Sequence, residues 1–108
     1  MIVSDKTVKF TFDNNFKWNK YEEDFKKLVL QTKEPVHIIW DLIKMKKTPS
    51  ISIASKQGML LLTNKSKIKN NTLTNTILVS SKEMKSTIEN ILKTVYKPLN
   101  PTQVILQN

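Results

Sequence analysis

Residues 36–42 read Val-His-Ile-Ile-Trp-Asp-Leu, a nearly continuous apolar run. Such a run is typical of the central strand of a parallel sheet that is covered on both faces. Apolar and polar residues alternate over residues 7–12, which is the two-residue period of a half-buried strand. Residues 73–79 and 103–106 are two further apolar runs, and residues 2–3 favour a short opening strand. The sequence therefore predicts four strands, or five with the opening one.

Helical periodicity separates these strands. Between residues 19 and 32 the apolar residues recur at helical spacing, and the acids at 22–24 are expected in the first turn, where the helix dipole favours anions. Thr48 is expected to cap a second helix that continues to residue 62, with Pro49 in its first position. Residues 63–72 then form a polar connection to the next strand.

A third helix is expected after Ser80 or Ser81, either of which can act as its N-cap. The elements then follow the order β-α-β-α-β-α-β, which specifies an α/β fold with a single layer of four or five mainly parallel strands and three helices. A chain of 108 residues has room for one core, so residues 1–108 are expected to form a single domain. The apolar stripe predicted for the third helix comprises Met84, Ile88, Ile91, Leu92 and Val95.

The chain resembles a STAS-like domain, the fold of sulfate transporter tails and anti-sigma factor antagonists, and the small related domains near the CRAL-TRIO fold. In that family a hydrophobic strand ends in Asp-Leu-Ser, and after a short turn a helix opens with Asp-Ser-Ser-Gly. Here Ile43, Pro49 and Ser52 stand where the family has the strand-end serine, the aspartate and the glycine. The residues that carry the resemblance are Ile38–Leu42, Met45, Thr48–Ser50, Thr76–Ser81 and Tyr96–Pro98.

This resemblance implies a regulatory module that binds another protein. It also places Ser50 where an anti-sigma factor antagonist carries its phosphorylatable serine. Short proteins rich in lysine and asparagine look like those encoded by large DNA viruses of algae and protists, so a viral origin is a further expectation.

The positive charge is concentrated in the middle of the chain. The formal net charge is +9, all 18 basic residues are lysines, and the net charge is 0 over residues 1–41, +8 over 42–85 and +1 over 86–108. Lysine acts as a hydrated point charge and lacks the fork geometry with which arginine reads guanine and phosphate, so sequence-specific DNA recognition is not expected. Codon bias in an A/T-rich genome is the alternative source of this charge.

The predicted topology divides these lysines between two edges of the sheet. Lys65, Lys67 and Lys69 precede a strand and are expected at the amino-terminal edge. The loops after two parallel strands meet at the opposite edge, together with two helix N-termini that favour anions. Alternatively, the lysines there form a solvated surface and the hydroxyls cap their own helices. The candidate residues for binding an anion or a partner at this edge are Lys44, Lys46, Lys47, Thr48, Ser50, Ser81, Lys82 and Lys85.

No constellation of residues suggests catalysis. The chain has no cysteine and one glycine, so it offers no thiolate site and no glycine-rich phosphate loop, and neither a metal nor a cofactor is expected. The lone His37 is expected to pack or to form a hydrogen bond, and Asp41 to cap its loop or to pair with a lysine. Trp18, Tyr21 and Trp40 are expected in the core and not on a base-stacking platform.

These observations predict a non-enzymatic module that binds a protein partner. The alternative is a basic module that binds phosphoinositide head groups or nucleic acid phosphates nonspecifically, and a third hypothesis is a component of a virion or its assembly. No signal peptide and no transmembrane segment are expected, so the predicted location is the cytoplasm, or the host cytoplasm or virion if the protein is viral. The short first strand is expected to leave an exposed sheet edge, and such an edge favours a homodimer.

Overall fold

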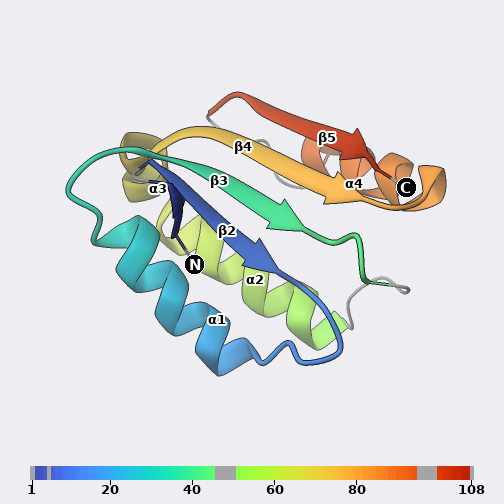
Figure 1. Cartoon of the computed structure of the whole chain (residues 1–108), viewed down its shortest axis with the longest axis horizontal. Coiled ribbons are helices and arrows are strands. Elements are labelled where there is room, and N and C mark those ends of the chain that lie inside the picture. The colour runs from blue at the N-terminus through green and yellow to red at the C-terminus, as the bar shows by residue number, and fades with distance from the viewer. Residues whose placement is uncertain (1, 5, 46–50, 95–99, 108) are drawn as a thin grey trace.

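Five strands form one sheet, and they lie side by side in the order in which they occur along the chain (Figure 1). The computed structural model describes residues 2–4, 6–45, 51–94 and 100–107. The strands are β1 (Ile2–Ser4), β2 (Thr7–Thr11), β3 (Val36–Asp41), β4 (Thr72–Val79) and β5 (Thr102–Leu106). The helices are α1 (Trp18–Phe25), the π-helix η1 (Lys26–Leu30), α2 (Ile51–Thr63), α3 (Lys65–Asn71) and α4 (Lys82–Thr94).

Strands β2 to β5 are all parallel, and β1 pairs antiparallel with β2. Each crossover steps to the next strand in the same direction, so crossovers of the usual right hand place their helices on the same face of the sheet. In Figure 1, α2 passes behind β2 and part of α4 lies behind β4 and β5, whereas α1 lies below β2. The predicted α/β class, the mainly parallel sheet and the alternation of strands and helices are confirmed.

The two faces of the sheet have different environments. Val8 and Ile38 are in register on the face that carries the helices, and both are buried. Ile39 and Asp41 lie on the other face and remain partly exposed. The expectation that residues 36–42 are covered on both faces is wrong, because the sequential strand order brings the helices to one face only.

The main core lies between the sheet and the helices α1, η1, α2 and α3. Phe25, Val29 and Ile38 have no exposed surface, and Leu60 and Ile68 bring α2 and α3 into the same cluster. Burial of such side chains provides most of the free energy that favours folding, at about 1.5–3 kcal/mol for each large apolar residue.

The aromatic residues form one packed group around Tyr21. The Tyr21 ring centroid lies 5.2 Å from that of Phe10 in an edge-on arrangement and 5.3 Å from that of Trp18. The Trp40 ring is stacked 6.5 Å from Phe10. Tyr21 is confirmed in the core, and Trp18 and Trp40 are partly buried and pack against it.

The first crossover helix changes its hydrogen-bond pattern midway, because η1 continues directly from α1 as a π-helix. Residues 22–24 were expected in the first turn, and this is wrong because α1 begins at Trp18. Two of these acids instead form ion pairs at i,i+4 spacing, Asp24 with Lys20 at 3.2 Å and Glu23 with Lys27 at 2.9 Å.

The end of η1 is held by a side chain from a distant element. A helix leaves its last backbone carbonyl groups without helical partners, and these groups need other donors when they are buried. The Asn71 side-chain amide donates to the carbonyl oxygens of Val29 at 3.0 Å and Leu30 at 3.2 Å. This contact joins η1 to the end of α3.

The second crossover contains two helices, whereas the sequence predicted one helix and a polar connection. The stretch expected as a connection forms α3, whose single buried residue is Ile68. The Asn64 side-chain amide donates to the Leu60 carbonyl at 2.9 Å at the junction of α2 and α3. The predicted cap Thr48 and the following Pro49 lie outside the described residues.

Gly58 lies in the interior of α2, where its backbone φ is not positive and an added Cβ would meet no atom within 4 Å. Glycine in a helix interior costs up to about 1 kcal/mol relative to alanine, because the unfolded chain loses more conformational entropy. We therefore expect Gly58→Ala to raise the free energy of unfolding by about 0.5–1 kcal/mol. Urea denaturation followed by circular dichroism measures this change, and an unchanged or lower midpoint would contradict it.

The start of α4 agrees with the sequence. The Ser81 hydroxyl accepts a hydrogen bond from the Met84 backbone N–H at 3.1 Å, so the predicted N-cap is confirmed. Met84 is buried, whereas Ile91 is 43% exposed, so the expectation that Ile91 belongs to the buried stripe is wrong. The predicted apolar residues therefore cover more of the surface of α4 than the part that packs against the sheet. Val95 lies outside the described residues.

Candidate functional site

The carboxyl ends of β3 and β4 meet at one edge of the sheet. The Leu42 backbone N–H donates to the Leu78 carbonyl at 2.8 Å, so the two strands leave the sheet side by side. Lys44 follows the end of β3 and Lys82 begins α4 directly after β4, so both lie at this edge. We call it the basic edge, and its described candidate residues are Lys44, Ser81, Lys82 and Lys85.

The lysines of the basic edge differ in their partners. Lys44 and Lys82 are exposed. Lys85 donates to Glu89 at 3.1 Å, so part of its charge is already balanced within α4. Sequence reasoning missed Glu89, although its i,i+4 spacing from Lys85 is the signal that reveals such a pair.

Ser81 lies at the start of α4. Its hydroxyl oxygen caps the helix, as described above, and its proton remains able to bond an anion. The first backbone N–H groups of α4 point out of the same end of the helix, where the dipole is positive. Capping alone accounts for Ser81, so an anion-binding role for this residue stays a prediction.

The other candidate residues follow Met45 in the sequence. Lys46, Lys47, Thr48 and Ser50 lie outside the described residues, so their positions relative to Lys44 stay predictions.

The second group of lysines lies at the opposite edge of the sheet. Lys65, Lys67 and Lys69 belong to α3, which leads directly into the amino-terminal end of β4. Lys67 and Lys69 are exposed. The structure thus separates the two groups as the topology predicted, although a helix and not a loop presents the second group.

Asp41 ends β3 beside the basic edge and has structural partners. One carboxylate oxygen accepts the Ile43 backbone N–H at 3.0 Å, and the other lies 3.3 Å from the Lys9 ammonium. The Asp41 side chain is only 13% exposed. Both expected roles, capping the loop and pairing with a lysine, are confirmed.

His37 lies on the face of the sheet that carries no helix. Its Nδ1 is 2.7 Å from the Thr74 hydroxyl, so the expected hydrogen-bonding role is confirmed. Asp41 lies four residues further along the same strand, about 13 Å away at the usual rise of a strand. The two side chains therefore cannot form a hydrogen-bonded pair.

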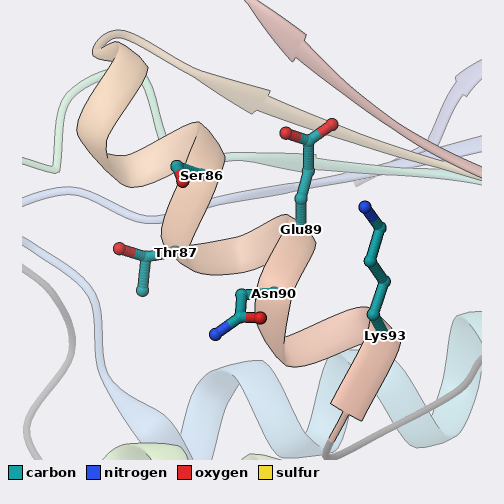
Figure 2. Close-up of a pocket in the computed structure, with 5 residues that line it drawn as sticks. All are labelled: Ser86, Thr87, Glu89, Asn90 and Lys93. Atoms are coloured by element: carbon teal, nitrogen blue, oxygen red, sulfur yellow. The ribbon is translucent and has the colours of Figure 1, made fainter.

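Described residues line two surface hollows, one on α4 next to Lys85 and one at the carboxyl end of β2. One hollow of about 370 Å³ is lined by residues of α4 alone. Figure 2 shows Thr87 and Asn90 on one side of this helix and Glu89 and Lys93 on the other, so these groups diverge. A ligand site needs a few convergent polar groups in a concave wall, which one helix cannot provide. A second hollow of about 220 Å³ lies between β2 and α1.

Tyr21 is the described residue with the most perturbed acidity. The Trp40 indole N–H donates to its hydroxyl oxygen at 3.4 Å, and Gln57 lies beside the same hydroxyl. Burial raises the pKa of Tyr21 far above its ordinary value of 10.0, because a phenolate would be poorly solvated there. This phenol is therefore neutral at physiological pH.

The described residues contain neither a metal-binding cluster nor a membrane-spanning helix. No group of three or more His, Asp or Glu residues is placed to hold a metal ion among them, and none of the described helices is long and apolar enough to cross a membrane.

No family model, curated protein or solved structure significantly matches the chain.

Proposed function

We propose that this domain is a non-enzymatic, STAS-like interaction module that binds a protein partner through its basic edge. The observation that carries the proposal is the convergence of exposed Lys44, exposed Lys82 and the N-terminus of α4 where two adjacent parallel strands end. Loops at the carboxyl ends of parallel strands are the usual place for binding groups in α/β folds.

The charges at this edge define the kind of partner. Asp41 on β3 is already engaged by Lys9 and by a backbone N–H, so it balances little of the charge on Lys44 and Lys82. The exposed Glu83 in the first turn of α4 offsets one of these two charges and leaves the pair of lysines net positive. The edge therefore favours an acidic surface on the partner. Lysines without a deep pocket provide electrostatic complementarity, which raises association rates and selects against basic partners.

A second candidate function uses the same edge for phosphate groups. The first turn of α4 begins with Lys82, and a helix N-terminus beside a lysine favours anions. In this case the ligands are anionic lipid head groups or nucleic acid phosphates, bound without sequence selectivity. A role in a virion or its assembly would be one use of such binding.

Charge reversal at the two edges of the sheet tests both functions. We expect the double variant Lys44→Glu and Lys82→Glu to lose binding, whereas Lys67→Glu and Lys69→Glu, with the same change of charge at the opposite edge, should retain it. The four side chains are exposed, so neither variant should change folding much. Crosslinking in an extract of the source organism measures protein binding. Retention on heparin, anionic liposomes and single-stranded DNA at two salt concentrations measures phosphate binding.

The outcomes separate the two functions. A defined protein crosslinked to the wild type and to the control, but not to the basic-edge variant, supports the protein-binding module. Retention that falls steeply with salt and disappears only in the basic-edge variant supports the phosphate-binding function, because salt opposes the release of counterions. If both double variants behave like the wild type in every assay, the basic edge has no binding role.

Phosphorylation of Ser50 stays a prediction from the resemblance. Mass spectrometry of the native protein tests it, and a peptide containing Ser50 with no modified fraction would count against a phosphoswitch. Localisation in the cytoplasm or a virion likewise belongs to this proposal.

A further inference from the structure

The two edges of the sheet are protected to different degrees. Natural sheets prevent unwanted pairing at their edges with short strands, bulges and lysines. The first edge has all three of these features. Its outer strand β1 has only three residues, the register of β1 with Thr7 and Val8 is irregular, and Lys9 follows on β2. The last edge is β5, which has five residues, no charge and a regular register with β4.

The outer side of β5 presents backbone groups for pairing. The Asn75 N–H donates to the Pro101 carbonyl, and the Gln107 N–H donates to the Val79 carbonyl. Backbone groups alternate in direction along a strand, so residues 101, 103, 105 and 107 face β4, and residues 102, 104 and 106 face outward. No other described element pairs with this side of β5.

We propose that β5 pairs antiparallel with β5 of a second copy of this chain, so that the two sheets become continuous. A two-fold axis beside Val104 sets Val104 opposite itself and Thr102 opposite Leu106 of the second copy. The three residues that face outward then exchange their N–H and carbonyl groups with the second strand.

Charge limits the places where a second copy can pair. The protein carries a net charge of +9, so most self-contacts would bring lysines together. Residues 100–107 contain no charged residue, and the adjacent helix α4 carries three lysines and two glutamates. A two-fold axis at β5 therefore joins two copies where their repulsion is smallest. This inference is independent of the basic edge, which lies at the ends of the strands.

The test uses two prolines, one on the edge strand β5 and one on β2 beyond the residues that pair with β1. Proline removes a backbone N–H and is tolerated in an edge strand where that N–H faces outward. Val104→Pro removes an outward N–H of β5. The matched control Thr11→Pro removes an outward N–H of β2, since the Phe12 N–H donates inward to Asp41. Sedimentation equilibrium measures association, and circular dichroism checks that each variant is folded.

We expect the wild type to dimerise reversibly in the micromolar range or more weakly, since a single five-residue strand pair is a small interface. Added salt should strengthen the dimer, because it screens the repulsion between two basic chains. Val104→Pro should weaken dimerisation by about tenfold or more, through the loss of two hydrogen bonds at the axis, and Thr11→Pro should leave it within about twofold. If Val104→Pro fails to fold, Gln103→Lys places a lysine at an exposed position of β5 and should weaken the dimer similarly.

Three results would overturn the proposal. They are a wild type that stays monomeric at millimolar concentration, a dimer lost with Thr11→Pro but not with the β5 variants, and a dimer that salt dissociates. None of them bears on the proposed function, whose test concerns Lys44 and Lys82. In turn, a basic edge without a binding role would leave the β5 dimer unaffected.

Discussion

Phe25→Ala is expected to reduce the free energy of unfolding by about 3–5 kcal/mol. The Phe25 side chain has no exposed surface, and its ring lies 5.8 Å from that of Phe10 and 6.0 Å from that of Tyr21. Truncation removes the apolar contacts and leaves a cavity between α1 and the sheet. A domain of this size has a total stability of about 5–15 kcal/mol, so the variant should be partly unfolded at 37 °C. Thermal and urea denaturation measure the loss.

Phe16→Ala is the control for this prediction. Phe16 also belongs to the aromatic group, with its ring 4.8 Å from that of Phe12, but its side chain is only partly buried. Its truncation should cost about 1–2 kcal/mol, because water can fill the space left at the surface. Equal losses from the two variants would contradict a core centred on Phe25.

The strands were predictable because their patterns are local. The run at residues 36–42 and the alternation at 7–12 differ in period from any helix, and both strands begin within one residue of their predicted positions. The order of strands in the sheet is not a local property. The apolar run therefore led to the wrong prediction that β3 is covered on both faces, and the partly exposed face with His37 and Ile39 followed only from the structure.

Helix α3 was missed because it has almost no apolar pattern. Ile68 is its only buried residue, and a seven-residue helix with one apolar anchor gives no periodicity to detect. The tertiary contacts that hold it, such as the donation of the Asn71 amide to η1, join residues more than 40 positions apart. Helix propensity of the lysines was the only local signal.

The candidate site was predictable in its location but not in its chemistry. The rule that parallel strands end at one edge was enough to bring Lys44 and Lys82 to the same edge. The i,i+4 spacing of Lys85 and Glu89 within α4 could have revealed their ion pair, but no local pattern could show that Lys9 from a neighbouring strand engages Asp41. Such a pair depends on the register between two strands, and the spacing of residues along one strand does not determine that register.

The stability of the protein is expected to fall above pH 10 by up to about 1.4 kcal/mol per pH unit on account of Tyr21 alone. Burial raises the pKa of Tyr21 in the folded state, whereas the unfolded chain ionises near the ordinary value of 10.0. Between these two values the unfolded state has lost a proton that the folded state retains. Rising pH therefore favours unfolding, and the contribution of Tyr21 is complete only below pH 10.

Tyr21→Phe isolates this contribution, because it keeps the ring in the core and removes the ionisable group. The variant loses the hydroxyl that accepts from Trp40, so it should be somewhat less stable at pH 8. Between pH 10 and pH 11, however, its free energy of unfolding should fall less steeply than that of the wild type, by about 1 kcal/mol per pH unit. Urea denaturation at half-unit steps of pH gives both slopes, and the titration of lysines affects them equally. Parallel slopes would mean that the Tyr21 phenol ionises as readily in the folded protein as in the unfolded chain, which its 4% exposure and ring contacts on several sides argue against.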